Sequence, residues 1–304
     1  MLRSGKPVLL DGGLSNELEA LGMDLNNSLW SASILKNNQD AIIKAHLNYL
    51  RAGADIIITS SYQASEMGFE AVGLAQDQAQ ALIIKSVELA QTAVEEFMRA
   101  HSLAGYNPPL IAASIGPYGA AMADGSEYHG NYGITSDVLK CFHLSRLSLL
   151  DGTEADILAC ETIPSMQEAR VLHDLLLNAN TPAWVCFSCK DGERVSDGTK
   201  IEQLAMLFKD HPKVIAIGIN CTPPQYVNEL IGRIKSAAPD KAIIAYPNSG
   251  ERYDAYTKTW HGTVEPLSCG LAAKSWCDAG AIIIGGCCRM GPEHIKAMKE
   301  QSLG

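Results

Sequence analysis

Clusters of basic residues and long apolar runs are both missing from this 304-residue chain. Its 24 Lys and Arg residues face 34 Asp and Glu residues, and the formal net charge of -10 argues against nucleic acid or an anionic membrane as a partner. No apolar run approaches the length that spans a bilayer, and the run near the first residue is too short for a signal peptide. We therefore expect a cytoplasmic protein with neither kind of partner.

Several familiar motifs are absent as well. No G-x-G-x-x-G follows the first apolar segment and there is no P-loop, which disfavours a nucleotide-binding open sheet. The eight histidines form no H-x-H or H-E-x-x-H, so a hydrolytic metal site built on histidine has no support. The one C-x-x-C, Cys186 with Cys189, has no second copy to complete a zinc ribbon. In a strand its two residues would face opposite sides, so we interpret both as structural.

What the chain does contain is one repeating unit. Short apolar segments with polar or glycine-rich ends alternate with helical patterns, and the eight segments are 8–13, 54–61, 109–117, 155–162, 183–189, 214–221, 242–250 and 281–288. Continuous apolar runs are typical of parallel strands buried on both faces. Eight strand–helix units without a linker predict a (β/α)8 TIM barrel, with residues 1–304 as a single domain. An open doubly wound sheet is the alternative.

Local signals place some helix ends and two long loops. Ser165 with Glu168, and Thr199 with Glu202, have the spacing of N-terminal capping boxes. Gly53 and Gly280 stand where helices should end. The connections 117–135 and 248–265 are longer than a barrel needs. Both follow the carboxyl ends of strands, so we expect them to lie as ordered loops over the face where barrel enzymes build their sites.

The nine cysteines are expected to be thiols in a reducing compartment. Three of them, Cys221, Cys287 and Cys288, stand at the ends of the sixth and eighth predicted strands, which point toward one barrel mouth. Gly285 and Gly286 precede the vicinal pair and would allow close backbone approach and unusual dihedral angles. Three converging thiolates with an open fourth position suit a catalytic Zn2+ ion. The alternative is that the vicinal cysteines are packing residues or a redox pair.

Zinc held by three thiolates carries a net charge of about -1 and is a poor Lewis acid for water. It can instead bind a substrate thiol as the thiolate, whereas a free thiol with a pKa of about 8.5 is mostly protonated at neutral pH. This chemistry favours transfer of an alkyl group onto a thiol.

Several sequence motifs, taken together, resemble those of a known family. "GINC" and "GGCCR", with "LLDGGLSNELEALG" and "ACETIPS", resemble the homocysteine S-methyltransferase family over essentially the whole chain. "SYQAS", "GPYGA" with "ADGSEY", and "YPNSGE" with "KTW" are similar to the branch that uses S-methylmethionine or S-adenosylmethionine. The betaine-using and cobalamin-dependent relatives share the barrel and the cysteines but lack this set of loop motifs.

The resemblance implies roles for single residues. Cys221, Cys287 and Cys288 would ligate zinc, with the homocysteine sulfur in the open position. Asp11 and Glu161 match family acids that hold the substrate ammonium, and two carboxylates at strand ends would attract a cationic amine. The proposed partners of the substrate carboxylate are Thr59 and Ser60, for which a helix N-cap role is the alternative.

Four further assignments follow. Asn220, next to Cys221, could orient this metal ligand without binding the metal itself. The candidates near the methyl donor are Trp30, Tyr246 and Asn248. An aromatic face attracts a sulfonium cation without competing as a nucleophile. Ordinary packing at the rim is the alternative for all three.

The resulting hypothesis is a zinc-dependent methyl transfer from S-methylmethionine or S-adenosylmethionine to homocysteine, which gives methionine. Alternatives are a methyltransferase for selenocysteine or another small thiol, a zinc-dependent barrel hydrolase or lyase, and a non-catalytic barrel with structural zinc. The partners would be small molecules only. The chain stops soon after its eighth unit with no arm to wrap a neighbour, which favours a monomer.

Overall fold

Eight parallel strands form a barrel in the computed structural model, which describes residues 6–25, 32–101, 107–254, 259–262 and 264–302. The strands are β1 (Val8–Leu9), β2 (Ile56–Ile58), β3 (Leu110–Ile115), β4 (Ile157–Ile163), β5 (Ala183–Phe187), β6 (Val214–Asn220), β7 (Ala242–Tyr246) and β10 (Ile283–Ile284). Their order is β1-β10-β7-β6-β5-β4-β3-β2, and a parallel bridge between Leu10 and Ile56 closes the circle. The predicted TIM barrel is confirmed, and the open-sheet alternative is wrong.

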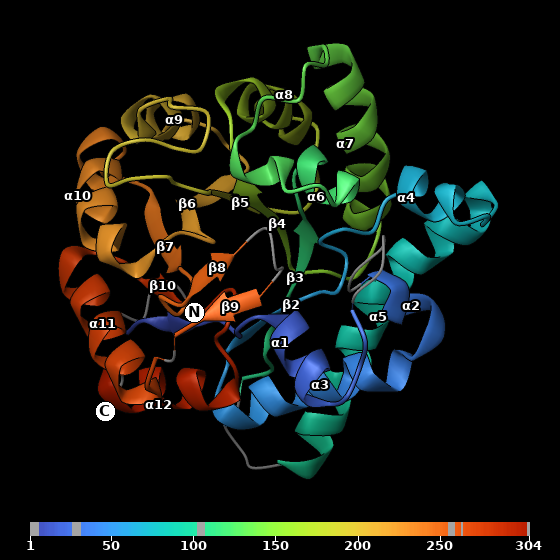
Figure 1. Ribbon diagram of the computed structural model, residues 1–304, viewed down its shortest axis with the longest axis horizontal. Coiled ribbons are helices and arrows are strands. Elements are labelled where there is room, and N and C mark those ends of the chain that lie inside the picture. The colour runs from blue at the N-terminus through green and yellow to red at the C-terminus, as the bar shows by residue number, and fades with distance from the viewer. Residues whose placement is uncertain (1–5, 26–31, 102–106, 255–258, 263, 303–304) are drawn as a thin grey trace.

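The helices surround the strands in Figure 1. They are α1 (Leu14–Ala20), α2 (Ala32–Asn37), α3 (Gln39–Ala52), α4 (Glu66–Ala71), α5 (Gln76–Ala100), α6 (Tyr118–Met122), α7 (Ser136–Asp151), α8 (Met166–Leu176), α9 (Ile201–Phe208), α10 (Val227–Ala237), α11 (Pro266–Ala279) and α12 (Pro292–Ser302), with the 3-10 turns η1 (Ser126–Tyr128) and η2 (Pro224–Tyr226). Over the described ranges, no helix combines the length and the apolar character that a membrane crossing needs.

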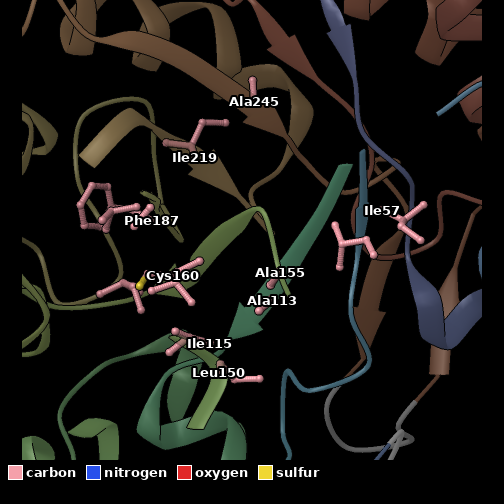
Figure 2. Packing of buried hydrophobic residues seen from close by; sticks show 14 of the residues in the cluster. Ile57, Ala113, Ile115, Leu150, Ala155, Cys160, Phe187, Ile219 and Ala245 are labelled. Atoms are coloured by element: carbon pink, nitrogen blue, oxygen red, sulfur yellow. The ribbon is translucent and has the colours of Figure 1, made fainter. Parts of the chain in front are cut away.

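Each strand is buried on both faces, as its continuous apolar sequence predicts. Alternate residues belong to two clusters, because successive side chains of a strand point to opposite sides. Those facing the helices, such as Ile115, Phe187 and Ile219, form the larger cluster seen in Figure 2. The others fill the barrel interior. Cys186 lies in the interior cluster and Cys189 in the outer one, so the structural interpretation of this C-x-x-C is confirmed.

The helix-end predictions had mixed outcomes. The Ser165 hydroxyl accepts a hydrogen bond from the Glu168 N–H at 3.2 Å and caps α8, while Gly53 and Gly280 end α3 and α11 at positive φ. The prediction for Thr199 is wrong, because α9 follows Lys200 without a side-chain cap. Thr199 lies instead in a turn where its carbonyl accepts from the Val195 N–H.

Both long loops contain structure of their own. The connection after β3 holds α6 and η1, and the connection after β7 holds a two-stranded hairpin, β8 (Arg252–Asp254) with β9 (Thr259–His261). The sequence patterns did not predict this hairpin. Residues 255–258 and 263 of that loop lie outside the described residues.

Candidate active site

The three predicted cysteines come together beyond the carboxyl ends of β6 and β10. The Cys221 sulfur lies 3.1 Å from the Cys287 sulfur and 3.6 Å from the Cys288 sulfur. All three sulfur atoms lie within 4.8 Å of one another. Three sulfur ligands from two strand ends could therefore reach one ion.

The backbone around the thiols is tightly constrained. A Cβ on Gly285 would lie 2.5 Å from the Cβ of Leu10, and one on Gly286 would lie 2.5 Å from the Cβ of Met290. Neither glycine has a positive φ. The left-handed conformations fall instead on Cys221, with φ 48°, and on Arg289, with φ 65°. A non-glycine residue in this region is strained, and such strain often accompanies functional sites.

Two asparagines hold the cysteine-bearing segments. Asn220 accepts a hydrogen bond from the Thr162 N–H at 2.6 Å, and its amide donates to the Thr162 hydroxyl at 2.8 Å. The side-chain oxygen of Asn248 accepts from the Cys288 N–H at 3.2 Å, and the backbone N–H of Asn248 donates to the Thr222 carbonyl. Asn248 therefore positions the thiol cluster from the start of the long loop after β7.

The thiols influence one another's ionisation. Hydrogen bonds from Cys221 and Cys287 stabilise the Cys288 thiolate and hold the pKa of Cys288 well below its ordinary value. The pKa of Cys221 is raised, chiefly by its hydrogen bonds to Cys287 and Cys288. Three adjacent thiolates repel one another, and a divalent cation would reduce that repulsion.

Asp11 and Glu161 are buried carboxyl groups close to the thiols. Burial raises the pKa of Asp11 well above its usual value and that of Glu161 to about 8. One Asp11 oxygen accepts from the Ile58 N–H at 2.8 Å, while the other is buried without a hydrogen-bond partner. Glu161 accepts from the Ser114 hydroxyl and lies at a register shift of β4, a local irregularity that can re-aim a side chain. Both groups are suited to receive a cation.

The two residues after β2 differ in their availability. The Thr59 hydroxyl accepts from the Ser114 N–H at 3.0 Å and is hydrogen bonded to the Ser61 hydroxyl at 2.7 Å. The buried Ser60 hydroxyl has no partner. Ser60 is therefore the more available of the two for a ligand, whereas Thr59 braces the strand end. Neither caps a helix, because Ser65 is the N-cap of α4.

Of the three donor candidates, Tyr246 and Asn248 lie within the described residues. Tyr246 is 1% exposed and lies in the barrel interior, with its ring centre 6.4 Å from that of Trp184. Burial is the main reason that the pKa of Tyr246 is raised, and the charges of Cys186 and Glu161 raise it further. This position brings Tyr246 beside the Glu161 carboxyl. Trp30 lies outside the described residues.

The loop after β3 carries further residues to the thiols. Tyr128 on η1 has its pKa raised well above its usual value, first by the charge of Cys221, and the charge of Glu127 acts on Cys288. Tyr62, after β2, is also close enough to Cys221 for its pKa to be raised, although burial is the larger cause. Tyr62 belongs to "SYQAS", and Glu127 and Tyr128 belong to "ADGSEY". Neither motif predicts a role for these three residues, because only the loop conformation shows where they lie.

Two buried side chains fasten these loops. Glu168 on α8 accepts from the Tyr118 N–H at 2.7 Å, the Tyr132 hydroxyl at 2.9 Å and His143 Nε2 at 2.7 Å. Arg146 on α7 donates to the carbonyls of Gly116, Ser61 and Tyr62 at 3.0 to 3.1 Å. Both ends of the segment that contains η1 are therefore tied to the outer helices.

The structure is a closed (β/α)8 barrel with three thiols and two buried carboxyl groups at its mouth. These features are those of a barrel enzyme whose reaction involves a thiol. A sequence model of the family "Homocysteine S-methyltransferase" matches residues 8–302. The chain belongs to the homocysteine S-methyltransferase family and is a methyltransferase.

Individual relatives agree with this assignment. Homocysteine S-methyltransferase YbgG of Bacillus subtilis is 48% identical over 95% of this chain and 92% of its own length. Selenocysteine methyltransferase of Astragalus bisulcatus is 42% identical over 97% of this chain. The crystal structure of the homocysteine methyltransferase MmuM from Escherichia coli in its metallated form has a TM-score of 0.88 at 40% identity, and covers 99% of this chain and 98% of MmuM.

Proposed function

We propose that this enzyme is a zinc-dependent methyltransferase that moves a methyl group from S-methylmethionine, or S-adenosylmethionine, to the thiol of homocysteine and so forms methionine. The observation that carries the proposal is the meeting of Cys221, Cys287 and Cys288 within 4.8 Å. Residues 1–304 would act as one functional domain.

Zinc fits the donor set of this site. Soft thiolate ligands favour zinc over the harder cations that prefer oxygen, and three protein ligands leave one coordination position open. When bound, zinc would supply the homocysteine sulfur as a thiolate at neutral pH. Asn220 and Asn248 would keep Cys221 and Cys288 in place. Similarity to a metallated methyltransferase supports a metal here.

The chain would orient homocysteine by its amino-acid end. Asp11 and Glu161 would receive the ammonium, because a buried carboxyl with a raised pKa gains a counter-charge when a cation arrives. The free hydroxyl of Ser60 would donate to the substrate carboxylate, with Thr59 holding that strand end. Fixing the acceptor in this way would align its sulfur with the donor methyl.

In the reaction, a sulfur–carbon bond forms between homocysteine and the methyl group, and the sulfur–carbon bond of the sulfonium donor breaks. The donor takes the bonding electron pair and leaves as a neutral thioether. The proton of the homocysteine thiol is released before transfer. Because charge disperses in the transition state, a closed site that excludes water would favour the reaction.

A direct test measures the metal content of the purified protein and the formation of methionine from homocysteine with each donor. We expect about one zinc per chain. Alanine variants of Cys221, Cys287 and Cys288 should lose both the metal and turnover, whereas Cys141→Ala, at an exposed position on α7, should keep both. Full activity in all three site variants would refute the proposal.

A second acceptor is favoured by one comparison. The similarity to a selenocysteine methyltransferase supports a test of selenocysteine beside homocysteine. A higher kcat/KM for the selenol would make selenocysteine the preferred acceptor. The thiol donor set and the family both argue against the hydrolase or lyase alternative.

A further inference from the structure

Glu127 is a third acidic residue near the thiols, and it belongs to a loop rather than to a strand end. It lies on η1, in the connection between β3 and α7. Glu168 holds this connection near both ends through Tyr118 and Tyr132. The packing is close, because a Cβ on Gly119 would collide with the Glu127 backbone nitrogen. Glu127 is therefore carried on a fastened segment.

The carboxyl group of Glu127 has an unused oxygen. Its Oε2 atom is buried without a hydrogen-bond partner, and within the described ranges no basic side chain forms an ion pair with it. Burial is the main reason that the pKa of Glu127 is raised to about 7. A buried carboxyl oxygen with no partner is costly unless a ligand satisfies it.

The surroundings of Glu127 place it on the side of the thiols. Its charge acts on Cys288 and on Tyr62, and Tyr62 in turn is close enough to Cys221 to respond to the charge of that thiol. Glu127 does not belong to the group of ligand atoms within 4.8 Å of one another. It is thus near the reacting centre without being one of the ligands.

We propose that Glu127 binds the α-ammonium group of the methyl donor. This inference rests on the proposed function, in which Asp11 and Glu161 already receive the ammonium of homocysteine. The donor brings a second amino-acid ammonium, and Glu127 offers an unpaired carboxyl oxygen at the same mouth. A hydrogen bond between a carboxylate and an ammonium is among the stronger polar contacts in proteins.

The ammonium is a better partner than the sulfonium on physical grounds. The sulfonium loses its positive charge during transfer, so a carboxylate paired with it would stabilise the bound donor more than the transition state and would slow the reaction. The charge of the ammonium does not change. Pairing with it strengthens donor and transition-state binding equally, which lowers KM and leaves kcat unaffected.

The test compares Glu127→Gln with wild type on two donors, S-methylmethionine and its desamino analogue (3-carboxypropyl)dimethylsulfonium. We expect the substitution to raise the KM for S-methylmethionine by about 10- to 100-fold, with kcat within about two-fold and an unchanged KM for homocysteine. The desamino donor should be used equally well by both proteins, because it lacks the group that Glu127 binds. Glu154→Gln, at an exposed position before β4, controls for the loss of one charge.

Other outcomes separate the inference from the function on which it rests. An equal loss with both donors, or a raised KM for homocysteine, would overturn the role of Glu127 while methyl transfer stands. Absence of methyl transfer to homocysteine by wild type with both S-methylmethionine and S-adenosylmethionine would overturn the proposed function and the inference together. If Glu127→Gln folds poorly, Glu127→Asp replaces it, because aspartate keeps the charge on a shorter side chain. Its KM for S-methylmethionine should lie between those of wild type and Glu127→Gln. The assignment is supported if its KM for the desamino donor equals that of wild type.

Discussion

Asn220 and Thr162 are joined by two hydrogen bonds across the barrel mouth, from the Thr162 N–H at 2.6 Å and to the Thr162 hydroxyl at 2.8 Å. Asn220 precedes Cys221, and Thr162 follows Glu161. Both Cys221 and Thr162 have positive φ, at 48° and 59°. The pair therefore couples the strained ends of β6 and β4, so that a proposed metal ligand and a proposed substrate-binding acid share one support.

Removing this support should weaken metal binding more than it weakens the fold. We expect Asn220→Ala to reduce zinc affinity by about 10- to 100-fold, the usual effect of losing a residue that orients a ligand. Thr162→Val removes the hydroxyl that accepts from the Asn220 amide but keeps the N–H that donates to Asn220. Because one of the two hydrogen bonds remains, its effect should be smaller. Competition with a chromophoric chelator would measure both. Equal zinc affinity in Asn220→Ala and wild type would contradict the supporting role.

Glu161 should affect the acceptor rather than the metal. We expect Glu161→Gln to raise the KM for homocysteine by roughly 10- to 100-fold, because a hydrogen bond to a charged group contributes about 1.5–3 kcal/mol. Zinc content should remain at the wild-type level, since Glu161 is not among the clustered ligand atoms. Steady-state kinetics and metal analysis of the same preparation check both statements. Loss of zinc with an unchanged KM would show that Glu161 serves the metal instead.

The barrel and its thiols could be predicted because the relevant signals are local or follow from topology. Apolar strands buried on both faces are visible in the sequence, and parallel strands in a barrel bring their ends to one mouth whatever their separation along the chain. Cys221 and Cys287 are thus placed together by strand order alone. Gly53 and Gly280 were predictable for a similar reason, because a helix often ends at a residue with positive φ, which favours glycine.

The loops were not predictable in the same way. The charge of Glu127 acts on Cys288 because of the path of the loop that contains α6 and η1, and Glu168 holds that loop from a helix far along the sequence. The spacing of Glu168 suggested a capping box, yet its side chain binds Tyr118, Tyr132 and His143 instead. Thr199 failed as a cap because the preceding turn uses its backbone. Such outcomes depend on tertiary contacts that compete with local preference.

His46 should make the fold sensitive to acid. Its ring is fully buried on α3, neither ring nitrogen has a hydrogen-bond partner, and burial lowers the pKa of His46 to about 4. The unfolded chain takes up this proton near the ordinary pKa of 6.5, whereas the folded protein does not. Stability is therefore complete above about pH 6.5 and falls as the pH drops toward 4, by at most about 3 kcal/mol from this group.

The difference between wild type and His46→Leu isolates that contribution. Urea unfolding at pH 7 and pH 4.5 should show a smaller loss of unfolding free energy in the variant, because leucine has no proton to gain. His129→Gln, at an exposed position, should behave like wild type. An identical pH dependence in His46→Leu and wild type would mean that the buried imidazole gains its proton in the folded state.

Glu168 links the stability of the outer helices to the geometry of the mouth. Replacing it by Gln leaves one acceptor oxygen for three donors, so we expect the free energy of unfolding to fall by about 1–3 kcal/mol. Because Tyr118 and Tyr132 flank the segment that carries Glu127, the KM for the donor should rise more than the KM for homocysteine. Tyr132→Phe removes a single contact and should show a weaker form of both effects. Thermal unfolding and donor kinetics of the two variants test both effects. If Glu168→Gln is destabilised but its donor KM is unchanged, Glu168 only stabilises the fold. If Glu168→Gln is not destabilised, other contacts hold the loop.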